Sequence, residues 1–152
     1  MKYFIPEWDD RVDPCYDFQR DSFGLFRTGR DSDVYAHQLF SKKTYDGILV
    51  SKHILEENPG RMRQATALKI HKCLRVEDSF PTMGDCGAWS YVNEDEPVWS
   101  VPEVASFYER LGFNFGVSVD HMIVKSIQKR DRYGNLFRYI LSESDKKNRF
   151  NI

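Results

Sequence analysis

The sequence predicts an α/β fold in which short parallel strands alternate with covering helices. Three short predicted strands are separated by two segments that carry helix start and stop signals, and this alternation is typical of a parallel sheet. The chain has 152 residues, of which 41% are hydrophobic and 30% are charged. One globular domain with a buried core, or part of a larger one, is therefore expected.

The first strand and the first helix are expected in the middle of the chain. The apolar run at residues 47–50 predicts a buried strand over residues 46–51. Asn58 followed by Pro59 is typical of a helix N-cap and first turn, so a helix is expected over residues 59–75. The residues that could line one face of this helix are Met62, Ala65, Leu68 and Cys73.

A second strand and a second helix follow with clearer boundaries. Residues 81–86 predict a strand that ends in a glycine-containing turn. Residues 100–111 predict a helix, because Ser100 and Glu103 form a capping-box pattern and Gly112 can end the helix. The residues that form its apolar stripe are Val101, Val104, Tyr108 and Leu111.

The remaining segments are less regular. Residues 115–120 predict a third strand, residues 128–135 a polar loop, and residues 142–150 another helix. The aromatic and acidic residues 1–44 are expected to form an irregular segment, with at most a short hairpin, that packs on the βα units of residues 45–152.

Composition limits the possible environments and partners. The net charge of −1 excludes a generally cationic nucleic-acid-binding surface, but residues 122–152 contain eight basic and three acidic residues. This basic end could face phosphates, or it could be a solvated helix face and loop. No apolar run approaches the ~18 residues that a membrane helix needs. The early acidic residue Glu7 does not fit a signal peptide, and three widely spaced cysteines predict a reducing, cytoplasmic location.

Two carboxylates stand at the ends of consecutive predicted strands. Asp85 ends the second strand and Asp120 ends the third. The carboxyl ends of parallel strands form the ligand-binding edge of α/β folds, so a shared cleft is expected there. Gly87 would allow close approach of a ligand to the backbone, and Trp89 could offer a flat face for a base to stack on. The alternative is that Asp85 caps a turn and Trp89 fills the core.

The type of ligand is indicated by the second carboxylate. An ionised Asp120 can accept two N–H donors, such as those on the edge of a guanine-like base, although a loop or capping role remains open. The four histidines are isolated from other metal-ligand types, so no metal site is expected. A catalytic triad, a P-loop and a dinucleotide-binding glycine motif are also lacking.

These residues resemble a known family. The sequence Asp85-Cys86-Gly87-Ala88-Trp89 is similar to the Asp-Ser-Gly-Gly-aromatic motif of the tRNA-guanine transglycosylases, and Asp120 follows at a spacing close to the archaeal type. The stretches at residues 45–51 and 84–91 look more like the DNA-modifying paralogues of phages and bacterial genomic islands. Those paralogues insert 7-deazaguanine derivatives into DNA. The resemblance covers about residues 45–125.

The resemblance implies a fold and a reaction. The family's enzymes are (β/α)₈ barrels that exchange guanine in a nucleic acid for a 7-deazaguanine by double displacement. It implies that Asp85 is the general acid and base, that Trp89 stacks on the base, and that Asp120 binds the amide and amino edge. Cys86 and Gly87 are implied as further substrate-binding positions. Cys86 stands where the family has Ser, and Ser90 stands where it has Gln.

Length is the main departure from the family. A (β/α)₈ barrel needs about 250 residues, so this chain is expected to form a partial barrel, the N-terminal part of such an enzyme. No residue matches the family's nucleophilic Asp or its zinc site, so the chain alone is expected to be inactive and to hold no cofactor.

The implied partners are DNA or tRNA, a 7-deazaguanine base, and either a C-terminal half or a second copy of the chain. No membrane partner is expected. The alternative function is a non-catalytic nucleic-acid-binding or interaction remnant of such an enzyme.

Overall fold

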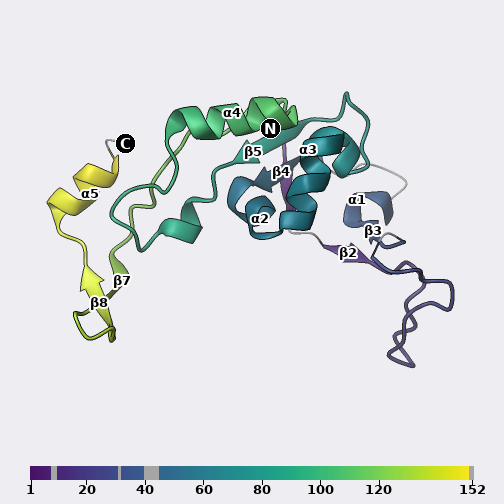
Figure 1. The fold of residues 1–152 in the computed structure, drawn as a ribbon, viewed down its shortest axis with the longest axis horizontal. Helices are drawn as coiled ribbons and strands as arrows, with labels where there is room; N and C mark the ends of the chain where they lie inside the picture. Colours follow the sequence, from purple (N-terminus) through teal and green to yellow (C-terminus); the bar gives the residue numbers. More distant parts are fainter. Residues whose placement is uncertain (8–9, 31, 40–44, 151–152) are drawn as a thin grey trace.

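The fold is centred on a four-stranded parallel sheet, shown in Figure 1. The computed structural model describes residues 1–7, 10–30, 32–39 and 45–150. In the sheet, the strands lie side by side in their chain order, β1-β4-β5-β6, and all neighbouring pairs are parallel. Their bounds are Phe4–Glu7, Gly47–Ser51, Thr82–Asp85 and Phe115–Gly116. The predicted parallel α/β sheet is therefore confirmed.

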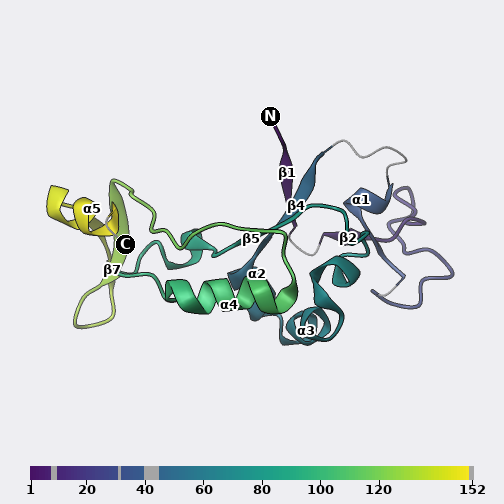
Figure 2. The same cartoon turned by 90° about the horizontal axis from the view of Figure 1, so that it is seen from above.

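The helices between the strands lie on one side of the sheet, as Figure 2 shows. The predicted helices are confirmed as α3 (Pro59–Cys73) and α4 (Val101–Leu111), and the shorter α2 (Lys52–Glu57) was not predicted. In α3, Asn58 accepts a hydrogen bond from the backbone N–H of Arg61, as its capping role requires. The helix is interrupted at Lys69, which has a positive φ of 68°.

The core lies between the sheet and these helices. Ile48 and Val50 point to the helical side and are almost fully buried. Tyr108 of α4 packs over Gly84 and Gly116, which are paired across β5 and β6. A Cβ atom at either glycine would come within 2.4 Å of the Tyr108 ring, so this close helix-to-sheet contact requires glycine. From the predicted apolar stripes, Val104, Tyr108, Leu111, Ala65 and Cys73 are buried, whereas Val101 and Leu68 are exposed.

The opposite face of the sheet is only partly covered. Because side chains alternate along a strand, Leu49 and Met83 point away from the helices, and both are partly exposed. Phe115 on the edge strand is 47% exposed on the same face. Parallel sheets are normally covered on both faces, so this partly exposed apolar face is unusual.

The first strand of the sheet was not predicted from the sequence. Residues 4–7 were expected to be irregular, but they form β1, which pairs in parallel with β4. Pro6 at the third position made a strand hard to predict, and it is tolerated because β1 is an edge strand. Farther along, Arg11–Val12 (β2) and Val34–Tyr35 (β3) form a short antiparallel pair, and Ala36–Leu39 (α1) is one helical turn.

Two further expectations were wrong in extent. The third predicted strand is shorter than residues 115–120, because β5 ends at Asp85 and leaves the later residues of this segment without a neighbouring strand. The segment predicted as a polar loop contains a hairpin, made of Ser126–Arg130 (β7) and Leu136–Ile140 (β8). The helix expected near the end is present as α5 (Glu143–Phe150).

No helix in the described ranges is both long and apolar enough to span a membrane.

Candidate functional site

The first predicted carboxylate stands at the carboxyl end of β5. The side chain of Asp85 accepts a hydrogen bond from the backbone N–H of Gly87 at 2.9 Å, which fixes the carboxylate in a tight turn. Its partial burial raises the pKa of Asp85 above the ordinary value for Asp, and the nearby negative charge of Asp120 raises this pKa further. The group is thus biased toward holding a proton.

The turn after Asp85 requires glycine. Gly87 has a left-handed φ of 86°, and a Cβ atom there would lie 2.7 Å from both the Cβ of His53 and the Oγ of Ser51. The chain therefore passes directly against the residues that follow β4, and it then forms a 3₁₀ helix, η1 (Ala88–Tyr91). Trp89 lies on this helix with 69% of its surface exposed, so its indole is available to a ligand and does not fill the core.

Asp120 lies beyond β6, in an extended segment that is held in place at this residue. The hydroxyl of Tyr91 donates to the backbone carbonyl of Asp120 at 2.9 Å, and the thiol of Cys86 donates to Oδ1 of Asp120 at 3.2 Å. Cys86 is fully buried, and burial raises the pKa of its thiol, so the S–H donor is retained. Tyr91 and Cys86 also contact each other at 3.1 Å.

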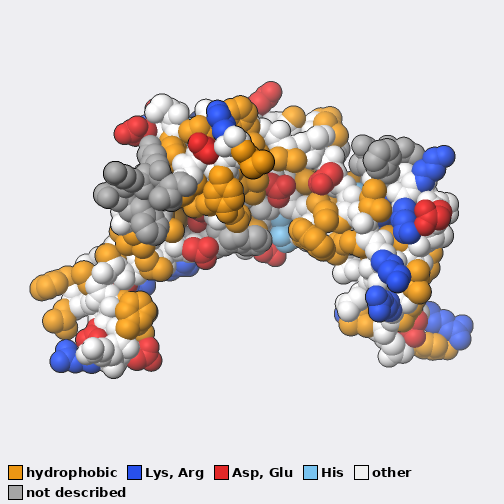
Figure 3. Space-filling view, turned by 180° about the vertical axis from the view of Figure 1, so that it is seen from behind, with side chains coloured by type: hydrophobic (Ala, Val, Ile, Leu, Met, Phe, Trp, Pro, Cys, Tyr) orange, Lys and Arg blue, Asp and Glu red, His pale blue; other side chains and the backbone are white. Residues whose placement is uncertain are grey.

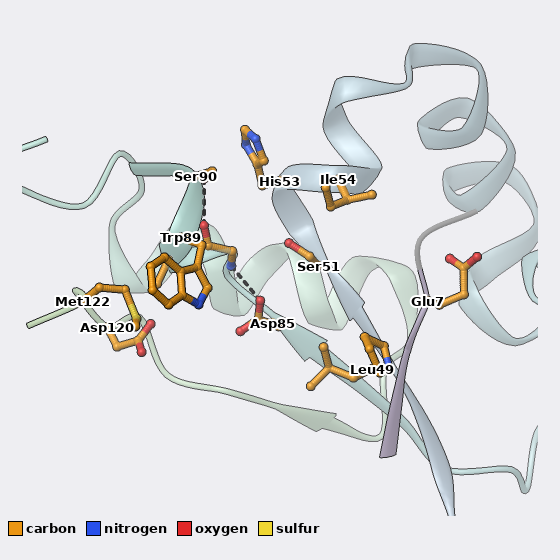
Figure 4. A pocket seen from close by; sticks show the side chains of 13 residues that line it. Glu7, Leu49, Ser51, His53, Ile54, Asp85, Trp89, Ser90, Asp120 and Met122 are labelled. Atoms are coloured by element: carbon orange, nitrogen blue, oxygen red, sulfur yellow. Dashed lines mark hydrogen bonds between the residues drawn. The ribbon is translucent and has the colours of Figure 1, made fainter. Parts of the chain in front are cut away.

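The structure brings the two carboxylates to one cavity of about 490 Å³, which is drawn in Figure 4. Asp85, Gly87, Trp89 and Asp120 all line it, although only Asp85 stands at the end of a strand and Asp120 lies four residues beyond β6. Cys86 does not line it; its side chain supports Asp120 from behind. The cavity has the size of an ordinary small-ligand site, about 300–1,000 Å³.

Other lining residues were not predicted. Ser51, His53 and Met122 line the same cavity, and so does Glu7 at the end of β1. Ser51 could have been found, because it ends a predicted strand and the strand-end argument applies to it equally. Glu7 could not be found in this way, because residues 4–7 were not recognised as a strand.

Metal-ligand side chains are not clustered in the part of the chain that the structure describes. Within the described residues, no group of three or more His, Cys, Asp or Glu side chains is arranged to hold a metal ion.

Gly87 provides a direct test of the turn that forms the cavity. We expect Gly87→Ala to lower the free energy of unfolding by about 2 kcal/mol or more, because alanine is strained at positive φ and its Cβ would overlap Ser51 and His53. Chemical denaturation followed by circular dichroism measures this change. Gly134→Ala is the matched control, because Gly134 also has a positive φ but no atom lies near its added Cβ. An equal loss in both variants would show that only backbone strain matters at Gly87.

The fold and the cavity together define a class of protein. A parallel sheet that carries a small-ligand cavity at its carboxyl edge is the arrangement of α/β ligand-binding and catalytic domains. Two carboxylates and an exposed aromatic ring in such a cavity suit a flat ligand with N–H donors.

Comparison with known proteins narrows this class. Over 131 residues the chain is 40% identical to a protein of Salmonella montevideo named DNA-guanine transglycosylase. The match covers 81% of this chain and 31% of that protein, so the chain spans about a third of the length of the curated relative it matches. No family model matches the chain. The resemblance that the sequence motifs indicated is confirmed: the chain is a homologue of a DNA-guanine transglycosylase.

Proposed function

We propose that this chain is the N-terminal part of a transglycosylase that exchanges guanine in DNA for a 7-deazaguanine derivative. The observation that carries the proposal is the cavity in which Asp85, Asp120 and Trp89 meet at the carboxyl edge of the parallel sheet. DNA is preferred over tRNA as the polymer because the homologue is named for DNA. An enzyme that acts on cellular DNA in a bacterium would work in the cytoplasm.

The proposed architecture is the first part of a (β/α)₈ barrel. Four features support it: the strands of the four-stranded sheet are all parallel, they follow chain order, α2, α3 and α4 lie on one side of this sheet, and its other face is apolar but incompletely covered. In a barrel that face would point to the interior and pack against side chains of later strands. The division into residues 1–44 and 45–152 then separates an N-terminal segment from the βα units, with β1 joining the two through its pairing with β4.

The proposed base-binding role of Asp120 follows from the hydrogen-bond acceptors of its carboxylate and from the contact that orients it. A carboxylate has no donor, so it can accept both the amide N–H and the amino N–H of a guanine-like base. Oδ1 already receives one hydrogen bond from Cys86, and this bond orients the carboxylate from behind. Trp89 would stack on one face of the base. Stacking of a base on an aromatic side chain contributes about 1–3 kcal/mol to the free energy of binding.

Asp85 is the proposed proton carrier. Protonated Asp85 would give its proton to guanine as the bond between the base and C1′ of the sugar breaks and C1′ bonds to an enzyme carboxylate. By the family resemblance, that carboxylate belongs to a later part of the barrel. The Asp85 carboxylate would then take the proton of the incoming 7-deazaguanine as its nitrogen attacks C1′ and the bond to the enzyme breaks. The raised pKa of Asp85 supports this role, because a general acid must hold its proton more readily than an ordinary Asp does.

Base binding tests the proposal without requiring turnover. We expect Asp120→Asn to weaken binding of guanine and of a 7-deazaguanine by about tenfold to a hundredfold, because an amide N–H₂ would face the N–H groups of the base. Isothermal titration calorimetry on the 152-residue chain measures this change. Asp78→Asn is the matched control, because Asp78 is exposed and lies outside the cavity. Absence of guanine binding by the unmodified chain would favour the alternative function, a non-catalytic remnant.

A further inference from the structure

The β7–β8 hairpin concentrates positive charge in a chain that is slightly acidic overall. Residues 125–140 contain five basic residues and one acidic residue, while the whole chain has a net charge of −1. The basic residues are Lys125, Lys129, Arg130, Arg132 and Arg138. The acidic one, Asp131, accepts hydrogen bonds from Tyr133 and Asn135 within the turn, so its carboxylate is occupied in forming the turn. Figure 3 shows Lys and Arg side chains gathered on the lobe formed by the hairpin and α5.

The two faces of the hairpin differ in their contacts with the rest of the chain. Paired residues of an antiparallel hairpin point to the same side, so Ile127 and Tyr139 share a face with Lys129. Ile127 is buried and Lys129 forms an ion pair with Asp95 at 2.7 Å, which attaches this face to the rest of the chain. The opposite face presents Arg130 and Arg138, and both are exposed.

Both arginines are preorganised. Arg130 donates to the carbonyl of Gly134 at 2.8 Å, and Arg138 donates through Nε to the Oγ of Ser126 at 2.8 Å. Each bond uses part of one guanidinium group, which has five N–H donors, so each arginine retains donors for a second partner. At the tip, Tyr133 is 73% exposed and contacts Arg132.

The hairpin begins close to the cavity. Met122 lines the cavity, and β7 starts four residues later at Ser126. Because an extended chain advances about 3.3–3.6 Å per residue, the first residue of β7 is at most about 14 Å from Met122. A nucleic acid with one base in the cavity would place its neighbouring phosphates within this range, because successive base pairs of DNA are 3.4 Å apart along each strand.

We propose that the outward face of the β7–β8 hairpin binds the phosphate backbone of the DNA beside the base held in the cavity. The proposal rests on the proposed function for the position of that base. Arg130 and Arg138 are both positively charged and lie on the same face of the hairpin, so a polyanion is the partner that fits this face. A nucleotide turned out of a duplex needs its backbone held on the protein, and a preorganised arginine pair on the hairpin that follows the cavity-lining Met122 would supply this contact.

The test is the salt dependence of DNA binding. We expect the double variant Arg130→Ala/Arg138→Ala to bind a short fluorescein-labelled duplex about tenfold or more weakly at about 0.1 M salt, and to lower the slope of log K against log salt by about 1.8 for two lost phosphate contacts. Fluorescence anisotropy of the full chain measures both quantities. The matched control is Arg63→Ala/Lys72→Ala, which removes two exposed charges from α3, a helix that lies away from the hairpin (Figures 1 and 2).

Two further variants and one independent measurement separate the outcomes. Arg130→Lys/Arg138→Lys should keep most of the slope, whereas a purely structural role of the two guanidinium bonds would make it behave like the alanine variant. Guanine binding should be unchanged in all hairpin variants, so failure of the proposed function and failure of the hairpin proposal are distinguishable. The proposal is overturned if the unmodified chain does not bind DNA, or if the alanine variant keeps its affinity and slope. The second result would place the DNA contact on another part of the chain.

Discussion

Asp85→Asn is expected to reduce base exchange by about 10²–10⁴-fold, the usual contribution of a general acid and base. The assay protein is a chimaera in which the matched region of this chain replaces its counterpart in the Salmonella DNA-guanine transglycosylase. Exchange is followed as the release of labelled guanine from duplex DNA in the presence of a 7-deazaguanine. Asparagine keeps the shape of the side chain and can still occupy the turn before Gly87, but it cannot carry a proton.

The controls for Asp85 separate proton transfer from binding. Asp85→Asn should leave the affinity for guanine within a few-fold of the unmodified protein, whereas Asp120→Asn and Trp89→Ala should weaken that affinity. Asp78→Asn should change neither quantity. If the chain is the N-terminal part of the proposed enzyme, the 152-residue chain alone should release no guanine. Near-normal exchange by the Asp85→Asn chimaera would show that Asp85 only caps its turn.

Arg61→Ala is expected to lower the free energy of unfolding by about 3–5 kcal/mol, because it removes one member of a buried ion pair. Arg61 of α3 donates to Glu7 at the end of β1, and both side chains are buried. The substitution would leave the Glu7 carboxylate in a low-dielectric site without this guanidinium. Since Glu7 also lines the cavity, loosening of β1 should weaken guanine binding as well.

Urea denaturation of Arg61→Ala measures the stability effect, and Arg63→Ala is the matched control. Arg63 lies on the same helix but is exposed, so its removal should change the stability by no more than about 0.5 kcal/mol. The double variant Glu7→Gln/Arg61→Met should recover most of the loss, because a neutral pair avoids the buried charge. Equal effects of Arg61→Ala and Arg63→Ala would contradict the importance of the pair.

Local signals in the sequence were sufficient to predict the helices and strands in the middle of the chain. The capping box at Ser100 and Glu103 is present, with the Glu103 carboxylate accepting the backbone N–H of Ser100 at 2.7 Å. Gly112 ends α4 with a left-handed φ of 77°. Such signals act over a few residues and depend little on distant contacts. β4 was likewise predicted from its local apolar run at residues 47–50.

The segments at either end were harder to predict because their structure depends on distant partners. β1 is stabilised by its pairing with β4, about 40 residues away, and by the contact of Glu7 with Arg61. The β7–β8 hairpin contains many charged residues. The face that contacts the rest of the chain can be recognised only from the burial of Ile127 and the ion pair between Lys129 and Asp95. Neither partner can be read from the local pattern.

The sequence by itself indicated a parallel sheet and the candidate site residues Asp85, Trp89 and Asp120. The end of β5 and the turn at Gly87 follow from local signals, whereas β1 was not recognised and β6 ends before Asp120. Only the tertiary structure decided how these residues are supported. It placed Cys86 behind Asp120 and out of the cavity, and it brought Glu7 and Ser51 to the same edge from strands far apart in the chain. The physical reason is that hydrogen bonds and burial between distant segments depend on packing, which no local pattern encodes.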